Sequence, residues 1–249
     1  MKKYLLAICT IAVITTSANQ AFAKDDGMVE DFISNNIVIS SDFGLVSNYV
    51  FRSITQSGDR SAIQGTIEAD HKNSGLYIGF WGSSINFKAN TQEDIELDWY
   101  GGYRKEFKNV SADAGVIYYS YPGVVGSLDY DFYETYIDLS SSYKKLGFGS
   151  KINYSPDYFA GSGNSYYYNA YLGYNYNKSI SLNGSVGYQE IGEEGTYGLP
   201  DYLDWLVGVE YKLTKKASLN LSYTDNNIKD VDCSGSCGSK LIIGILIGL

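Results

Sequence analysis

The chain has 249 residues, among them 25 tyrosines, 27 glycines and only three prolines, and its formal net charge is −9 at neutral pH. This negative balance argues against nucleic acid as a partner, because a nucleic-acid-binding surface needs a basic footprint. Tyrosine and β-branched residues suit a pleated surface, and glycine is tolerated where strands or tight turns crowd together. The composition therefore predicts an all-β protein.

The first 23 residues predict a signal peptide that is removed on export. Residues 2 and 3 are lysines, residues 4–14 form a short apolar core, and Ala21-Phe22-Ala23 has the small-x-small pattern that a signal peptidase cuts. The apolar run is too short for a membrane helix. We expect residues 24–36 to form a short periplasmic N-terminal segment and residues 37–249 to form the folded domain.

Polar and apolar side chains alternate with a period of two along most of the remaining chain. In one such segment, Ser218 and Asn220 alternate with Leu219 and Leu221. Alternation of this kind puts one set of side chains on each face of a β-strand. The pattern predicts twelve strands, at residues 37–54, 62–71, 75–87, 93–106, 110–120, 129–144, 146–155, 165–176, 179–190, 201–213, 216–226 and 239–249. Most of them are long enough for a tilted strand to cross a membrane, which takes about 9–11 residues.

Short and long connections alternate between these strands. The links after the even-numbered strands are short, as at Lys144-Lys145 and Asn177-Lys178, whereas the other links are mostly longer. Pro122, Pro156 and Pro200 all fall in the longer links, and proline is excluded from central strands because it cannot donate to the hydrogen-bond ladder. Tight periplasmic turns and longer external loops are typical of outer-membrane barrels. We therefore expect a closed antiparallel transmembrane β-barrel of about 12 strands, with a soluble β-sandwich as the alternative.

Cys233 and Cys237 are the two cysteines outside the signal peptide. An exported compartment permits disulfides, so we expect this pair to close a small ring at a loop tip. A metal site would need further ligands, and none lies nearby in the sequence. The sequence thus predicts a disulfide, no metal site and no cofactor.

Three stretches resemble the TorF-like family of bacterial outer-membrane porins. They are residues 47–57 followed by 62–65 (SNYVFRSITQS and AIQG), residues 75–83 (GLYIGFWGS) and residues 96–103 (ELDWYGGY). The resemblance implies an outer-membrane barrel that acts as a porin, with no catalytic residues to carry over. The chain departs from the family pattern at Ser53, where glycine would follow the arginine, and at Leu249, where barrel strands usually end in an aromatic residue.

Charged side chains fall on the polar parity of the predicted strands. A Lys or Arg that faces lipid costs up to about 2–4 kcal/mol at the midplane, so this parity is expected to face the lumen. The predicted pore-lining residues are Arg52, Glu68, Asp70, Glu96, Asp98, Arg104, Asp113, Glu134, Asp138, Lys151, Asp204, Glu210 and Lys212. Nine carboxylates against four bases predict an interior that concentrates cations. The same groups could instead pair across the barrel and fill it, since twelve strands lie between filled barrels of about 8 and open ones of about 16–18.

We expect an outer-membrane porin that allows passive, weakly cation-preferring diffusion of small polar solutes and cations. Its other partners would be outer-membrane lipid and lipopolysaccharide, and association of barrels into oligomers is left open. A non-conducting structural or adhesin barrel that acts through its external loops is the alternative. An outer-membrane hydrolase is less favoured, because such chemistry needs a base beside a nucleophile and the single histidine, His71, falls at a predicted turn.

Overall fold

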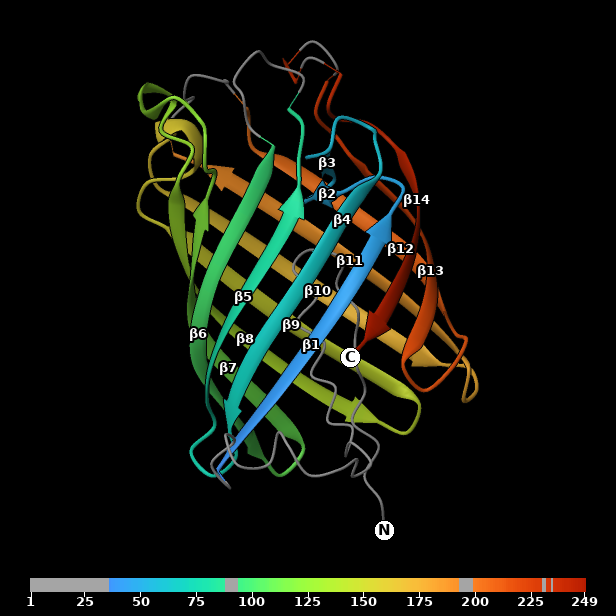
Figure 1. Cartoon of the computed structure of the whole chain (residues 1–249). Helices are drawn as coiled ribbons and strands as arrows, with labels where there is room; N and C mark the ends of the chain where they lie inside the picture. Colours follow the sequence, from blue (N-terminus) through green and yellow to red (C-terminus); the bar gives the residue numbers. More distant parts are fainter. Residues whose placement is uncertain (1–35, 88–93, 193–198, 230–231, 234) are drawn as a thin grey trace.

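The computed structural model describes residues 36–249 apart from 88–93, 193–198, 230–231 and 234. Within this part of the chain, twelve long antiparallel strands form one closed barrel (Figure 1), in which sequence neighbours pair and β1 pairs with both β4 and β14. The predicted closed antiparallel barrel is confirmed, and the alternative of a two-sheet sandwich is wrong. The expected signal peptide and N-terminal segment lie outside the described residues.

The barrel strands alternate in direction around the wall. They are β1 (Ile37–Val46), β4 (Ala62–His71), β5 (Leu76–Ser84), β6 (Ile95–Phe107), β7 (Val110–Ser120), β8 (Phe132–Tyr143), β9 (Leu146–Ser155), β10 (Ser165–Asn175), β11 (Ile180–Ile191), β12 (Tyr202–Lys212), β13 (Ala217–Asn226) and β14 (Lys240–Gly248). Two very short strands, β2 (Val50–Phe51) and β3 (Ile54–Thr55), pair with each other outside the barrel sheet.

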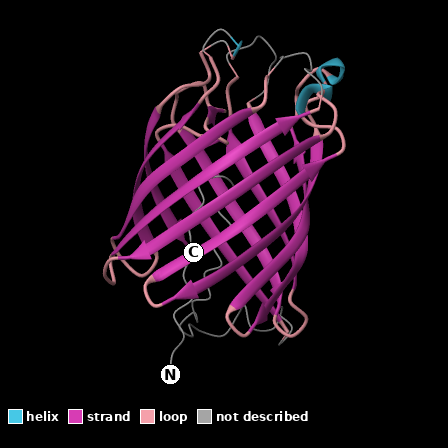
Figure 2. Cartoon of the chain, turned by 180° about the vertical axis from the view of Figure 1, so that it is seen from behind, coloured by secondary structure: helices cyan, strands magenta, loops and turns pink. Residues whose placement is uncertain are grey.

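The two ends of the barrel differ in their connections. Tight turns join β4 to β5, β6 to β7, β8 to β9, β10 to β11 and β12 to β13, and we call this the turn end. Lys108 and Lys144 adopt left-handed backbone conformations in two of these turns. The longer connections gather at the opposite, loop end (Figure 2), with the 3-10 helices η1 (Gly126–Leu128) and η2 (Phe159–Gly161). No described helix is long and apolar enough to cross a membrane.

The barrel is apolar outside and polar inside. In β14, Leu241, Ile243 and Ile245 are exposed on the outer surface. In β8, Ile137 is 59% exposed whereas Glu134 is 1% exposed. Because successive side chains of a strand point to opposite faces, the buried parity is the one that faces the interior. This arrangement is the reverse of a soluble β-sheet protein, which buries its apolar face.

The first strand departs from the sequence prediction. It was expected over residues 37–54, but β1 ends at Val46 and residues 47–61 turn into the barrel, where β2 and β3 form a hairpin. Arg52 and Ser53 form the hairpin tip with φ angles of 46° and 62°, as a type I′ turn requires at both central positions. The loop is closed by Asn48, whose Oδ1 accepts hydrogen bonds from Thr55 Oγ1 at 2.6 Å and Ser57 Oγ at 3.0 Å. Arg52 therefore lies at the tip of this hairpin and not within the strand that the sequence predicts over residues 37–54.

Candidate functional site

The barrel interior holds the thirteen charged side chains selected from the sequence. Twelve of them project from strands at inward positions, and Arg52 comes from the hairpin tip. Their distribution is Glu68 and Asp70 on β4; Glu96, Asp98 and Arg104 on β6; Asp113 on β7; Glu134 and Asp138 on β8; Lys151 on β9; Asp204, Glu210 and Lys212 on β12. Glu96, Asp98 and Glu134 are at most 1% exposed, whereas Lys212 is exposed at the turn end.

Arg52 links the hairpin to two distant strands. Its Nη2 donates to Oε1 and Oε2 of Glu134 on β8, both at 2.7 Å, and its Nη1 donates to Oε1 of Gln189 on β11 at 2.6 Å. The guanidinium also lies 4.1 Å from the ring centroid of Tyr167 on β10. Arg52 is only 4% exposed, so this is a buried ion pair inside the barrel. Removing one partner of such a pair typically destabilises a protein by about 3–5 kcal/mol.

Ser53 attaches the same hairpin tip to β13. Its hydroxyl lies within hydrogen-bond distance of the Thr224 hydroxyl, and its carbonyl accepts a hydrogen bond from Asn226 Nδ2 at 2.7 Å. Because β8 and β13 are separated by four strands in the barrel order, the hairpin tip spans the lumen. The hairpin therefore narrows the barrel near its loop end.

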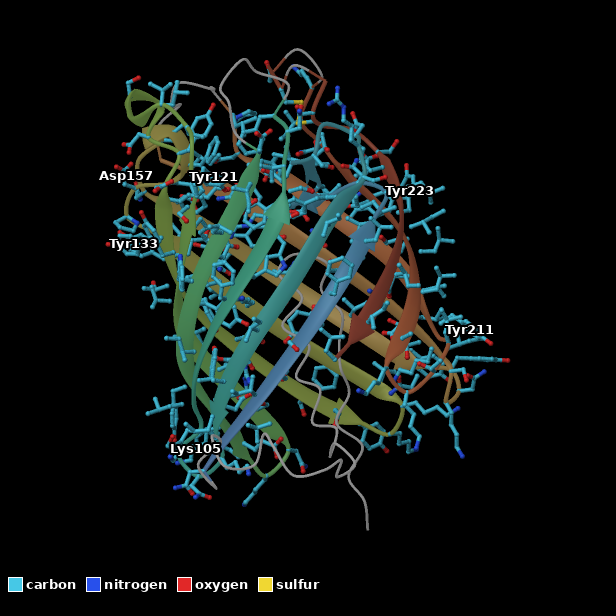
Figure 3. The ribbon with its side chains drawn as sticks, in the orientation of Figure 1. Lys105, Tyr121, Tyr133, Asp157, Tyr211 and Tyr223 are labelled. Carbon is cyan, nitrogen blue, oxygen red and sulfur yellow. A yellow bond between two sulfur atoms is a disulfide. The ribbon has the colours of Figure 1, made fainter. Side chains whose placement is uncertain are left out.

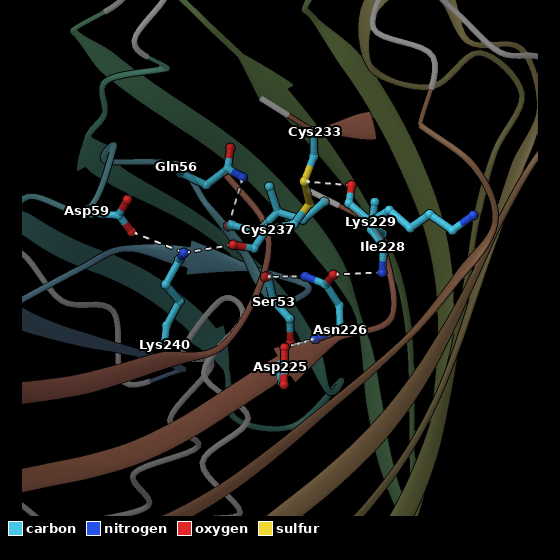
Figure 4. The surroundings of a disulfide bond; sticks show 11 residues. Ser53, Gln56, Asp59, Asp225, Asn226, Ile228, Lys229, Cys233, Cys237 and Lys240 are labelled. Carbon is cyan, nitrogen blue, oxygen red and sulfur yellow. Dashed lines mark hydrogen bonds and ion pairs between the residues drawn. A yellow bond between two sulfur atoms is a disulfide. The ribbon is translucent and has the colours of Figure 1, made fainter. Parts of the chain in front are cut away.

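A disulfide-closed loop holds the hairpin from the loop end. Cys233 and Cys237 are joined in the connection between β13 and β14 (Figure 4). The carbonyl of Ser236, within the ring that this disulfide closes, accepts a hydrogen bond from the backbone N–H of Thr55 at 3.1 Å. Ile54 of the hairpin packs in an apolar cluster that includes Cys237. The ring is therefore a direct support of β3.

Lys240 adds a polar connection at the same place. Its Nζ donates to the carbonyl oxygen of Cys237 at 2.9 Å and lies 3.4 Å from Oδ1 of Asp59, on the segment that follows the hairpin (Figure 4). The hairpin is thus fixed at its tip by Arg52 and Ser53 and at its base by the loop between β13 and β14. These contacts at both ends hold the hairpin in a defined position inside the barrel.

Aromatic side chains fill one side of the lumen, from the loop end toward the turn end. Tyr119 and Phe132 stack with ring centroids 4.3 Å apart, and Tyr49 lies 5.2 Å from Trp81. Burial raises the pKa of Tyr158 to about 12, although nearby Arg52 acts in the opposite direction, so this phenol is neutral at physiological pH. The buried cluster comprises Tyr49, Ala62, Tyr77, Trp81, Ile85, Tyr100, Ile117, Tyr119, Tyr121, Tyr130, Phe132, Tyr136, Tyr158 and Ala160. These residues leave little room along β5 to β8.

The opposite side of the lumen is lined mainly by small polar residues. The inward positions that carry serine, asparagine, threonine or glycine include Gly147, Gly149, Asn153, Ser155, Asn169, Gly173, Ser181, Asn183, Ser185, Gly187, Gly208, Ser218, Asn220, Ser222 and Thr224. A small cavity lies on this side, lined among others by Lys151, Asn153, Asn169 and Ser185, and it extends to the hairpin tip at Arg52 and Ser53. Small polar side chains along β9 to β13 therefore leave open space beside the hairpin.

Other predicted residues form an ion-pair cluster between the cavity and the turn end. Arg104 Nη1 lies 3.2 Å from both Glu68 Oε1 and Asp70 Oδ1, and its Nε lies 3.0 Å from Asp113 Oδ2. Asp98 differs from these carboxylates, because it is fully buried and neither of its carboxylate oxygens has a hydrogen-bond partner in the described structure. Among the described residues, no group of three or more histidine, cysteine, aspartate or glutamate side chains is arranged to hold a metal ion.

The hairpin and the wall of small polar residues along β9 to β13 are the parts of the site that the sequence did not predict. Residues 47–54 resemble the end of a strand because Tyr49, Val50, Phe51 and Ile54 are all residue types that favour β-structure. The unusual length of that predicted strand was the available signal for a break. Asn153 and Asn169 lie at inward positions that the alternation predicts. Because they carry no charge, nothing in the sequence distinguishes them from other polar strand residues.

Comparisons with known proteins agree on the fold. A family model described as "Bacterial protein of unknown function (Gcw_chp)" matches residues 33–242, and no curated protein matches the sequence. The barrel is similar to a KdgM porin, with a TM-score of 0.56 and 11% identity over 84% of this chain and 98% of that chain. It is also similar to a NanC porin, with a TM-score of 0.56 and 13% identity over 85% of this chain and 100% of that chain. At these identities the likeness shows the fold alone, and the resemblance to TorF-like porins is not confirmed.

Proposed function

The chain belongs to the Gcw_chp family of bacterial proteins, and we propose that it is an outer-membrane porin for passive, weakly cation-preferring diffusion of small polar solutes. The observation that carries this proposal is the uneven filling of the lumen, with aromatic packing along β5 to β8 and small polar side chains along β9 to β13. The fold that the chain shares with the KdgM and NanC porins supports it. The sequence resemblance to TorF-like porins points the same way.

The outer surface supports a location in a membrane. Tyr133 and Tyr223 project from the wall near the loop end, and Tyr211 projects from it near the turn end (Figure 3). Exposed aliphatic side chains such as Ile137 and Val207 lie between these levels. Aromatic residues at both edges of an apolar band are typical of membrane barrels, because their amphipathic rings suit the lipid–water interfaces. These features support an outer-membrane location, where lipid and lipopolysaccharide would surround the barrel.

The charge balance supports a preference for cations. Arg52 neutralises Glu134, and Arg104 is shared among three carboxylates, so negative charge remains in excess within the lumen. In a narrow water-filled pore, fixed carboxylates raise the local concentration of cations and repel anions.

One observation favours the second candidate, a non-conducting structural or adhesin barrel. The hairpin tip is buried and bound on three strands, so the barrel is narrow at the level of Arg52. In this alternative, the hairpin is a permanent plug and the loops at the loop end make the functional contacts. An outer-membrane hydrolase is the least favoured of the three functions.

Planar-bilayer recording of refolded protein tests the proposal. We expect small, stepwise conductance increases, and a reversal potential in a salt gradient that has the sign of a cation-preferring pore. Heat-modifiable mobility on a gel serves as the control, because it shows that the recorded sample contains folded barrel. Folded barrel that produces no conductance steps would contradict the porin proposal and favour the structural barrel.

A further inference from the structure

Two oppositely charged side chains inside the barrel lie opposite each other without forming an ion pair. Asp138 on β8 and Lys151 on β9 are direct cross-strand partners, and both line the cavity beside the hairpin. Cβ atoms of such partners are about 4.5–5.5 Å apart, which is close enough for an ion pair. However, Lys151 forms no ion pair with any residue that the structure describes. The ion pair that this register allows between Asp138 and Lys151 is therefore not formed.

Tyrosine residues hold the two charges apart. Lys151 Nζ lies 4.0 Å from the ring centroid of Tyr136, and Asp138 Oδ1 accepts a hydrogen bond from Tyr171 Oη at 2.5 Å. Tyr171 in turn lies against Gly149, where the ring leaves no room for a Cβ atom. Through these contacts the ammonium of Lys151 and the carboxylate of Asp138 line the same cavity while each contacts a different tyrosine.

The other charged groups of the cavity are engaged differently. The guanidinium of Arg52 is occupied by Glu134 and Gln189, so Lys151 is the cavity cation without a carboxylate partner in the described part of the barrel. Asp204 accepts hydrogen bonds from Tyr167 Oη at 3.1 and 3.2 Å and forms no ion pair within the described ranges. The cavity thus presents one ammonium and two carboxylates that form no close ion pair with a described residue.

We propose that this cavity binds a small zwitterion of the amino-acid class, with its carboxylate at Lys151 and its ammonium group at Asp138. A molecule that carries an ammonium and a carboxylate on one carbon atom would pair with both side chains through a charge-assisted hydrogen bond to each. A simple carboxylate would face two aspartates, and a simple amine would face Lys151, so each leaves a charge of the site unmatched. The amides of Asn153 and Asn169 provide further polar groups in the wall. This inference rests on the proposed porin only for the route by which the solute arrives.

Calorimetric titration of the refolded barrel tests the inference without any need for conduction. The probes are alanine, propionate and propylamine, which share a three-carbon skeleton and differ in charge. We expect a saturable heat for alanine and none for propionate or propylamine at the same concentrations. The variants Lys151→Gln and Asp138→Asn each remove one charge, and each should weaken alanine binding about tenfold or more.

A matched control separates the site from general electrostatics. Lys178→Gln removes a positive charge in the turn between β10 and β11, outside the cavity, and should leave alanine binding unchanged. Equal binding of alanine and propionate, or alanine binding that survives both cavity substitutions, would overturn the inference. If folded barrel conducts ions but binds no alanine, the inference fails and the porin proposal stands. If it binds alanine but does not conduct, the porin proposal fails and the site stands.

Discussion

Arg52 and Glu134 are 82 residues apart in the sequence, and their side chains meet inside the barrel with Nη2 2.7 Å from each carboxylate oxygen. The two side chains are 2% and 1% exposed. This contact joins the tip of an inward hairpin to the opposite wall, so it determines how much of the lumen is free at the level of the hairpin. The porin proposal depends on the space that remains beside this contact.

Breaking the pair should release the hairpin. In Arg52→Gln, Glu134 is left as a buried charge without its cation, a situation that typically costs about 3–5 kcal/mol. Because the hairpin can move while the barrel sheet stays intact, we expect larger conductance steps and an unchanged heat-modifiable shift. Single-channel recording measures the step size.

The double variant R52Q/E134Q is the control for this prediction. It also removes the buried negative charge of Glu134, so its step size should return toward that of the wild-type protein. A step size that is the same in all three proteins would show that Arg52 does not limit the lumen.

Cation preference should depend on the carboxylates that line the cavity. Replacing Asp138 and Asp204 together by asparagine removes two negative charges with little change in volume, so the reversal potential in a salt gradient should move toward zero. Asp157→Asn is the matched control, because Asp157 is exposed at the loop end (Figure 3) and should have a much smaller effect. Equal shifts in the two variants would mean that the loop end, and not the cavity, sets the preference.

Reduction of the disulfide should loosen the hairpin. The ring between Cys233 and Cys237 supplies the carbonyl of Ser236 to Thr55, and Cys237 packs with Ile54. We expect dithiothreitol to increase current fluctuations of single channels while the thermal stability of the barrel is nearly unchanged, because the ring closes only a short segment. The double variant C233S/C237S should show the larger fluctuations without reductant and no response to it. A reductant effect that persists in this variant would assign it to another cause.

The barrel could be predicted from sequence because alternation is a local property. The strand expected at 201–213 is β12, Tyr202–Lys212, and the inward parity of Asp204 and Glu210 followed from the same pattern. The hairpin could not be predicted in this way, since its turn at Arg52 and Ser53 is held by Glu134, Gln189 and Asn226, which are remote in the sequence. The lack of an ion pair between Asp138 and Lys151 could not be predicted from the sequence for a similar reason. Parity places both side chains inside, but their separation depends on tyrosines from β8 and β10.

The central claim is that the apolar parity of the strands meets lipid and the polar parity meets the lumen. The neighbouring residues Ser185 and Val186 on β11 test it most directly, because Ser185 lines the cavity and Val186 is 51% exposed on the outer face. The measurement is the free energy of unfolding in lipid vesicles for the variants S185K and V186K. We expect Val186→Lys to lower this free energy by about 2–4 kcal/mol, as a lysine does at the bilayer midplane, and Ser185→Lys to lower it much less. A larger loss for Ser185→Lys than for Val186→Lys would contradict the account.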